Sequence, residues 1–238
     1  MAGAPRFSAA DYAHDGKHHL LLAATGSVAT IKLPFIAYAL AKHKNVSIRV
    51  VVTPSAAEFL QSQSPEQPSL ESLPDMPGVD GVYYDADEWS KPWVRGDKIL
   101  HIELRRWAHV LLVAPLSANS LSKIANGMSD GLLMSVIRAW DTTALVDGRR
   151  KRIFVAPAMN TAMWHHPITS KQIKVLEKEW AAEGGNEQGW FTVLRPMEKE
   201  LACGDVGDGA MMDWREIVGH LENHLNLGPA PTKSGKTS

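Results

Sequence analysis

Short apolar runs alternate with helical patterns along most of the chain. Four runs are almost continuously apolar and a fifth is weaker; they cover 19–25, 46–53, 109–115, 153–157 and, less clearly, 190–194. Strands that are apolar at nearly every position are typical of parallel sheets, because helices cover both faces of such sheets. The pattern therefore predicts a parallel sheet.

Amphipathic segments between these runs predict the helices. They cover 28–43, with Pro34 near its start, 117–125, 129–140, 168–183 and 214–227. Ser129 or Asp130 is expected to cap the third of them. Alternating strands and helices imply right-handed crossovers. The sequence thus predicts an α/β fold: one doubly wound, Rossmann-like or flavodoxin-like parallel sheet with helices on both faces.

The predicted domain covers residues 18–227. Residues 1–17 and 228–238 lack periodicity and are expected to form a flexible N-terminal arm and a flexible C-terminal tail. The segment 63–98 holds five prolines and is expected to loop over the surface. The four basic residues 149–152 are expected to be solvated loop charges.

Composition narrows the classes of protein that this chain could represent. Its 238 residues carry 25 Lys and Arg against 26 Asp and Glu, so the net charge of −1 gives no indication of nucleic acid or a membrane as partner. The single cysteine, Cys203, cannot form an internal disulfide. No apolar run approaches the roughly 20 residues of a membrane span. We therefore expect a cytoplasmic protein.

Small, hydroxyl and amide residues follow four of the predicted strands. Because the carboxyl ends of parallel strands meet at one edge, these residues predict a shared ligand site there. Each of them could instead be an ordinary helix cap. The turn after the first strand lacks the dinucleotide fingerprint, so its exposed N–H groups favour the phosphate of a mononucleotide. The residues concerned are Gly26, Ser27, Val28, Thr53, Ser55, Ser117, Asn119 and Asn160.

Four blocks of the chain resemble one known family. They are LHIELRRWA at 100–108, APLSANSL at 114–121, PAMNTAMW at 157–164 and LACGDVGDGAM at 201–211. They resemble the homo-oligomeric flavin-containing cysteine decarboxylases, which include the halotolerance proteins. The resemblance extends over roughly 18–227 in family order, but it is poor at 63–98.

The resemblance implies a lyase that contains FMN and acts in coenzyme A biosynthesis. Its reaction would convert 4′-phosphopantothenoylcysteine to 4′-phosphopantetheine by transient oxidation to a thioaldehyde, loss of carbon dioxide and return of the electrons. The resemblance also implies a homotrimer with active sites between subunits. FMN would bind at the strand ends described above, and no metal is expected.

The resemblance assigns roles to individual residues. His101 and Cys203 would be catalytic, His101 in proton transfer and Cys203 in protonating the decarboxylated intermediate. Substrate would be bound by Asn160, Met163 and Arg106 and by a flap without regular structure, which includes Gly204, Asp205, Gly209, Ala210 and Met211. Without the resemblance, His101 could be a polar helix-start residue and Cys203 an inert buried thiol.

An alternative function stays open within the same family. Some halotolerance proteins are FMN-binding regulators that inhibit a protein phosphatase, so a phosphatase is a second candidate partner. Those relatives tend to carry an acidic C-terminal tail, whereas the charges of this tail are Lys233 and Lys236. That difference favours the enzyme.

Overall fold

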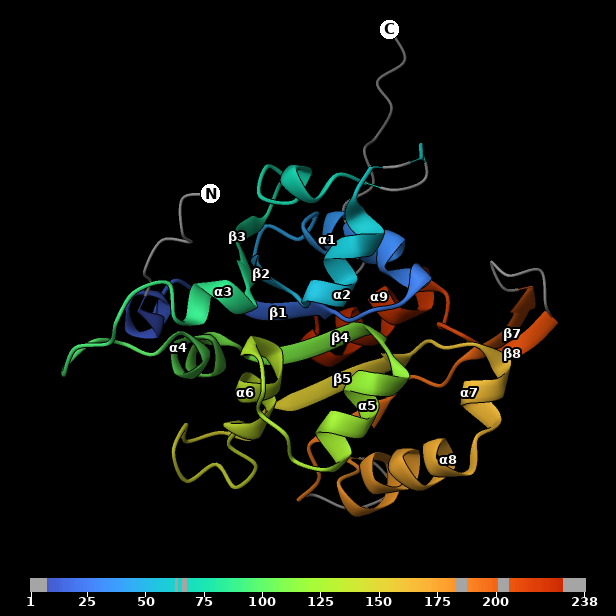
Figure 1. Ribbon diagram of the computed structural model, residues 1–238. Helices are drawn as coiled ribbons and strands as arrows, with labels where there is room; N and C mark the ends of the chain where they lie inside the picture. Colours follow the sequence, from blue (N-terminus) through green and yellow to red (C-terminus); the bar gives the residue numbers. More distant parts are fainter. Residues whose placement is uncertain (1–7, 63, 66–67, 183–187, 201–205, 229–238) are drawn as a thin grey trace, which may run out of the picture.

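Six parallel strands form the central sheet of the computed structural model (Figure 1). The structure describes residues 8–62, 64–65, 68–182, 188–200 and 206–228. The strand order is β3-β2-β1-β4-β5-β6, which is the order of Rossmann-type dinucleotide-binding folds. This confirms the doubly wound fold. The strands are β1 (His18–Ala24), β2 (Val46–Val52), β3 (Val79–Tyr84), β4 (Val110–Leu116), β5 (Arg152–Pro157) and β6 (Phe191–Val193).

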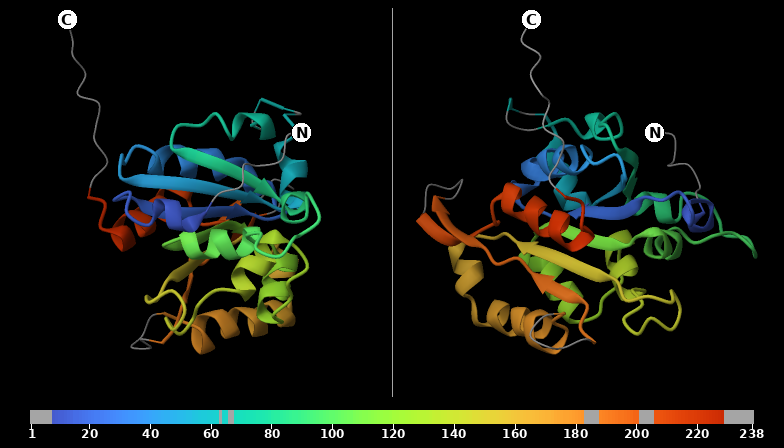
Figure 2. Two further views of the ribbon diagram at one scale, coloured as in Figure 1. Left: turned by 90° about the vertical axis from the view of Figure 1, so that its left-hand side faces the viewer. Right: turned by 180° about the vertical axis from the view of Figure 1, so that it is seen from behind.

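Helices cover both faces of the sheet (Figure 2). One face packs against α1 (Leu33–Leu40) and α9 (Trp214–Leu225), and the other against α4 (Leu100–Trp107), α5 (Ala118–Ala125), α6 (Leu132–Arg138) and α8 (Pro167–Lys174). Side chains of a strand point alternately to its two faces. In β1, Leu20 and Leu22 accordingly join one apolar core and Leu21 joins the other, and all three are fully buried.

Short elements connect this framework. The 3₁₀ segments are Ala9–Tyr12, Val28–Lys32, Glu58–Leu60 and Leu70–Ser72, and a π-helical turn, Val175–Glu179, extends α8. The remaining helices are α2 (Pro54–Ala57), α3 (Asp85–Glu88) and α7 (Thr161–His165). An antiparallel hairpin of β7 (Met197–Glu200) and β8 (Val206–Ala210) lies beside α7.

Two strands differ from the sequence predictions. β3 lies inside 63–98, where only surface loops were expected; Asp80 and Gly81 interrupt its apolar pattern because it is the edge strand. The flap was expected to lack regular structure, but β8 pairs with β7 there. The carbonyl of Gly209 accepts a hydrogen bond from Met159 N (3.0 Å). A Cβ at position 209 would lie 2.3 Å from Met159 O, so this approach requires glycine.

The third predicted helix begins later than expected and has a different cap. It starts at Leu132, and neither Ser129 nor Asp130 caps it. Instead, Asp85 Oδ1 of α3 accepts a hydrogen bond from Leu132 N (2.9 Å). A cap from a distant segment cannot be read from local sequence. The first predicted helix is also divided, since a 3₁₀ segment precedes α1 and Pro34 lies in its first turn.

Residues 8–17 depart from the expected flexible arm. The 3₁₀ segment Ala9–Tyr12 packs against α4. Ala9 N donates a hydrogen bond to Glu103 Oε2 (2.8 Å), and Ser8 is buried. Polar anchoring to α4 therefore orders a stretch whose sequence shows no periodicity.

Lys151 corrects the expectation of solvated charges at 149–152. It is 2% exposed, and its Nζ lies 2.6 Å from Asp147 Oδ2 and donates to Arg105 O (2.6 Å). Asp147 also pairs with the Arg105 side chain at 2.5 Å. Burial lowers the pKa of Lys151 to about 8, although the Asp147 carboxylate opposes that shift. Among the described residues, no helix has the length and apolar character needed to cross a bilayer.

Candidate functional site

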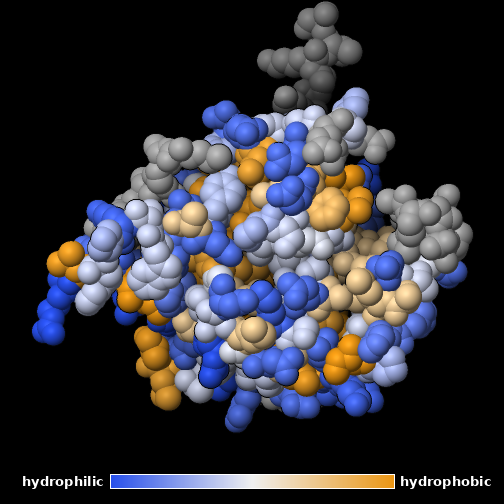
Figure 3. Space-filling view, viewed as in Figure 1, coloured by the Kyte–Doolittle hydropathy of each residue, from blue (hydrophilic) through white to orange (hydrophobic). Residues whose placement is uncertain are grey.

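A cavity of about 640 Å³ lies at the carboxyl ends of the strands. Its walls include the turns that follow β1 and β4, the neighbouring strands between which the strand order reverses. Ligands of open α/β sheets bind at this topological position. In Figure 3, apolar side chains gather beside the β7–β8 hairpin, which also contributes to the cavity wall.

Eleven of the predicted site residues line this cavity. They come from five segments that are far apart in sequence: Gly26, Ser27, Val28, Ser55, Ser117, Asn119, Asn160, Met163, Gly209, Ala210 and Met211. The prediction that the strand ends share one site thus agrees with the geometry, whereas the role of each residue stays a prediction.

The turn after β1 is held close to the turn after β4. Thr25 is fully buried; its Oγ1 donates to Pro115 O (2.9 Å) and accepts from Ser117 N (2.7 Å). On the other side, a Cβ at Gly26 would lie only 2.5 Å from Ser55 Cβ. Glycine at position 26 therefore allows Ser55 to pack directly against this turn.

The polar side chains of this edge divide into caps and unpaired groups. Ser27 and Ser117 are N-caps, and their hydroxyls accept from Ala29 N and Ser120 N. Within the described residues, the Ser55 hydroxyl and the Asn119 amide make no side-chain hydrogen bond. Their side chains are therefore available to a ligand.

Asn160 follows β5; its side chain caps a helix and also keeps free donors for a ligand. Its Oδ1 accepts from Met163 N (2.8 Å) and caps α7. This bond fixes the side chain and leaves the two N–H groups of Nδ2 as donors. Asn160 is exposed on the cavity wall, so these donors could reach an anionic group of a bound molecule.

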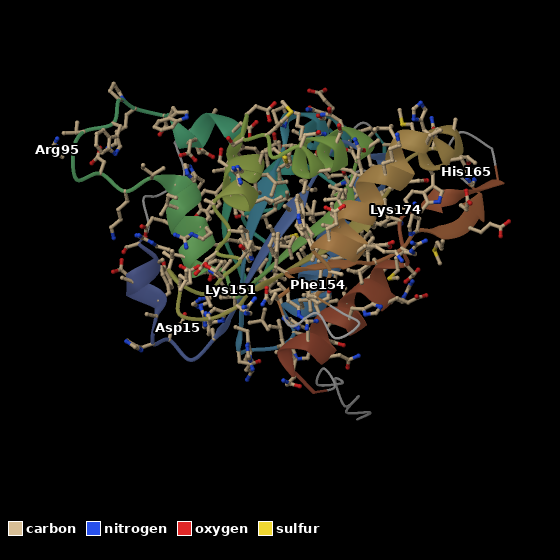
Figure 4. All side chains as sticks on the ribbon, turned by 90° about the horizontal axis from the view of Figure 1, so that it is seen from below. Asp15, Arg95, Lys151, Phe154, His165 and Lys174 are labelled. Atoms are coloured by element: carbon tan, nitrogen blue, oxygen red, sulfur yellow. The ribbon has the colours of Figure 1, made fainter. Side chains whose placement is uncertain are left out.

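The hairpin contacts α7 through the side chains of His165 and Asp208. His165 Nε2 lies 2.9 Å from Asp208 Oδ1, and Figure 4 shows His165 next to the hairpin. This contact connects β8 to the helix that carries Met163. The contact therefore holds β8 and α7, two parts of the cavity wall, next to each other.

Several predicted residues lie elsewhere. His101 and Arg106 belong to α4, on the opposite side of the molecule from the hairpin, and neither lines the cavity as the described residues form it. Thr53 does not line the cavity either; its Oγ1 donates to Ala24 O, at the end of the neighbouring strand β1 (3.2 Å). Cys203, Gly204 and Asp205 lie outside the described residues.

The surroundings of His101 are well defined. Its Nδ1 lies 2.8 Å from Glu88 Oε1, and its main-chain N donates to Glu88 Oε2 (3.2 Å). Arg106 is half exposed and its Nη1 lies 3.3 Å from Glu103 Oε1. His101 and Arg106 thus pair with different glutamates, Glu88 and Glu103, away from the cavity.

The sequence analysis missed part of the cavity wall. The missed residues are mainly apolar and give the site much of its hydrophobic surface; they include Ile31, Lys32, Phe59, Met159, Met197, Met212, Asp213 and Trp214. Lys32 and Met159 could have been predicted, because they lie close in sequence to the strand-end residues Val28 and Asn160. Nothing local indicates Phe59 or Met197, because tertiary packing alone brings them to the wall.

The arrangement suits a planar apolar group with an anionic end. Small-molecule sites are mostly apolar clefts of about 300–1,000 Å³ with a few placed polar groups. Met159, Met211 and Trp214 supply apolar surface, while the 26–28 turn and Lys32 can meet negative charge. The described part of the chain holds no cluster of His, Cys, Asp or Glu that could bind a metal ion.

Comparisons with known proteins agree with this geometry. A protein of Arabidopsis thaliana named phosphopantothenoylcysteine decarboxylase is 45% identical over 197 residues, which are 83% of this chain and 80% of that protein. A protein of the same name from Mus musculus is 40% identical over 210 residues, 88% of each chain. A probable thymidylate synthase of Schizosaccharomyces pombe is 45% identical over 214 residues, but the chain spans only 30% of its length.

Solved structures give the same result. A PPC decarboxylase mutant complexed with pantothenoylaminoethenethiol superposes with a TM-score of 0.68 at 41% identity, covering 88% of this chain and 99% of that one. The FMN binding protein AtHal3 superposes with a TM-score of 0.69 at 42% identity, covering 90% and 99%.

The relatives confirm the resemblance to flavin-containing cysteine decarboxylases that the sequence blocks indicated. The family model described as Flavoprotein matches residues 8–226. This chain therefore belongs to the Flavoprotein family.

Proposed function

We propose that this chain is an FMN-dependent decarboxylase that converts 4′-phosphopantothenoylcysteine to 4′-phosphopantetheine, with active sites shared between copies in a homotrimer. Relatives that match this chain over most of their length carry the name of that enzyme. A structural neighbour is named as an FMN binding protein. Coenzyme A biosynthesis is the setting in which this reaction would serve.

The cavity residues fit FMN. The 26–28 turn and the hydroxyl of Ser55 would hold the phosphate, because they line the same part of the cavity and offer N–H and O–H donors there. Ser117 and Asn119, on the other side of the strand-order reversal, would meet polar edges of the flavin. The apolar wall would pack against its ring system.

The chemistry requires a temporary electron sink. Loss of carbon dioxide from the cysteine unit leaves an electron pair that needs an acceptor, and a thioaldehyde next to the reacting carbon supplies one. Bound FMN would take up the two electrons of that oxidation and return them afterwards. Asn160 Nδ2 would hold the leaving carboxylate, His101 would accept the thiol proton, and Cys203 would deliver a proton to the product.

The separation of α4 from the cavity carries the oligomeric part of this proposal. His101 and Arg106 share a helix on the far side of the chain from Asn160, so one chain alone does not bring them together. If α4 of a second copy lies at the cavity mouth, the same residues complete the site. A closed ring of three copies would make three equivalent sites.

A complementation experiment tests the shared site. We expect His101→Asn and Asn160→Asp each to be inactive when alone. After the two variants are unfolded and refolded together, about one quarter of the sites should contain both native residues if copies exchange at random, and activity should recover to that level. The absence of any recovery would contradict shared sites.

The assay of the whole chain decides between the two candidate functions. Purified protein should be yellow, release FMN on denaturation, and liberate carbon dioxide from phosphopantothenoylcysteine without another subunit. A chain that binds FMN, releases no carbon dioxide and inhibits a protein phosphatase would favour the regulatory alternative. Colourless protein that takes up no added FMN would contradict both.

A further inference from the structure

We propose that Glu88 is the positioning residue for His101: its carboxylate fixes the orientation and the tautomer of the imidazole, so that Nε2 is the proton-accepting atom. The inference rests on the proposed function, in which His101 accepts the thiol proton. Glu88 lies within 63–98, the segment for which the family resemblance supplies no residue.

Both oxygens of the Glu88 carboxylate contact the same residue. Oε1 lies 2.8 Å from His101 Nδ1, and Oε2 accepts from the main-chain N of His101 (3.2 Å). The side chain of Glu88 is 6% exposed and that of His101 is 22% exposed. A buried carboxylate that holds the ring and its own main chain at once leaves the imidazole little rotational freedom.

The contact at Nδ1 also determines where the ring proton lies. An ionised carboxylate can only accept hydrogen bonds, so Nδ1 must carry the proton. The lone pair of the neutral ring is then on Nε2, which faces away from Glu88. The tautomer of a functional histidine is commonly set in this way, by the partner of its other nitrogen.

The other carboxylates near this helix junction are engaged elsewhere. On α3, Asp87 Oδ2 accepts from Tyr84 N (2.7 Å). On α4, Glu103 accepts from Ala9 N and pairs with Arg106. Within the described part of the chain, Glu88 is therefore the carboxylate that contacts the imidazole.

The arrangement has a direct chemical consequence. When the substrate thiol meets Nε2, the S–H bond breaks as an N–H bond forms, and the ring becomes a cation. The Glu88 carboxylate then stabilises that cation through the Nδ1–H group. Without Glu88, the proton can reside on Nε2 and block the acceptor position.

Glu88 also has a structural effect that the test must separate. Ile99 is the N-cap residue of α4 and makes no side-chain cap, so Glu88 Oε2 supplies an acceptor for the first turn. Ile99→Thr should provide a local cap without restoring a carboxylate at the ring. The double variant Glu88→Gln/Ile99→Thr therefore retains the helix start but not the tautomer control.

The experiment combines NMR with kinetics. Long-range ¹H–¹⁵N spectra of histidine-labelled protein, assigned with His101→Asn, should show the Nδ1–H tautomer of His101 in the native chain with or without FMN. In Glu88→Gln and in the double variant, the Nε2–H tautomer should become the major form. The kcat for carbon dioxide release should fall about 100-fold, with KM changed less than threefold.

Asp87→Asn is the matched control, because it replaces a neighbouring carboxylate of α3 that does not touch His101. Its tautomer and kcat should equal those of the native chain. The proposal is overturned if Glu88→Gln retains the Nδ1–H tautomer, or if Ile99→Thr restores kcat in the double variant. Full activity of His101→Asn would instead remove the proposed role of the histidine, while the NMR measurement on Glu88 would still be decisive for the tautomer.

Discussion

Protonation of His109 should control the acid stability of this fold. The residue precedes β4, and its ring lies 4.5 Å from that of His19, centroid to centroid. Its Nδ1 accepts a hydrogen bond from His19 N (3.2 Å), which requires an unprotonated nitrogen. Burial, followed by the positive charge of Arg149, lowers the pKa of His109 from 6.5 to about 3.

The size of the effect follows from proton linkage. The unfolded chain binds a proton at His109 below pH 6.5, whereas the native chain does not until about pH 3. Native stability is therefore fully present above pH 6.5 and falls as the pH decreases through this window. Each pH unit costs about 1.4 kcal/mol, so the loss between pH 6.5 and 5.0 is about 2 kcal/mol.

His109→Asn isolates this contribution. Asn retains an oxygen that can accept from His19 N but has no group that titrates in this range. Urea unfolding at one protein concentration, followed by circular dichroism from pH 7.5 to 5.0, should show the native chain losing about 2 kcal/mol more than the variant. His14→Asn, at an exposed position, should behave as the native chain does.

Equal pH dependence of the native chain and His109→Asn would refute the reasoning. It would mean that the ring accepts a proton in the native state without cost, and that the contact between His109 and His19 does not depend on its charge.

Three further changes should have measurable effects. Gly26→Ala should weaken FMN binding at least tenfold in a flavin fluorescence titration, because its Cβ would lie 2.5 Å from Ser55 Cβ; unchanged affinity would show that the turn does not hold the flavin. Lys151→Met should lower the free energy of unfolding by about 1–3 kcal/mol, since Asp147 loses its ammonium partner but keeps the Arg105 guanidinium, and Arg105 O loses its donor; a loss below about 0.5 kcal/mol would contradict this. Three main-chain N–H groups, together with a hydroxyl, lower the pKa of Asp141, so Asp141→Asn should destabilise the fold by about 2 kcal/mol at pH 7, and the difference should begin to decrease as the pH falls below about 4.

The sequence predicted the strands correctly where helices cover both faces of the sheet. β1, β2, β4 and β5 are covered on both faces, so their apolar runs reveal them to within about a residue. β3 was missed because it lies at the edge of the sheet and only some of its residues are buried, so its sequence is not a continuous apolar run. Helix α6 begins later than predicted because its cap is Asp85, which lies 47 residues away in sequence.

The site was predictable where topology alone places the residues. Parallel strands bring Ser55, Asn119 and Asn160 to one edge regardless of loop detail, and all three line the cavity. Phe59 and Met197 reach the wall only through tertiary packing, for which their local sequence holds no signal.

Residues of α4 posed a different difficulty. The family resemblance placed His101 in an active site shared between subunits, and that role stays a prediction because one chain keeps His101 away from the cavity. Its partner Glu88 was equally hidden, because it stands in the segment where the resemblance is poor.

The short helix α3 holds the first turns of two longer helices at once. Asp85 accepts from the start of α6, and Glu88, three residues later, accepts from the start of α4. Helices α4 and α6 also pack against each other. Amide hydrogens at the beginnings of these two helices should consequently exchange with solvent in a single opening event. Any displacement of α3 should therefore expose the first turns of α4 and α6 together.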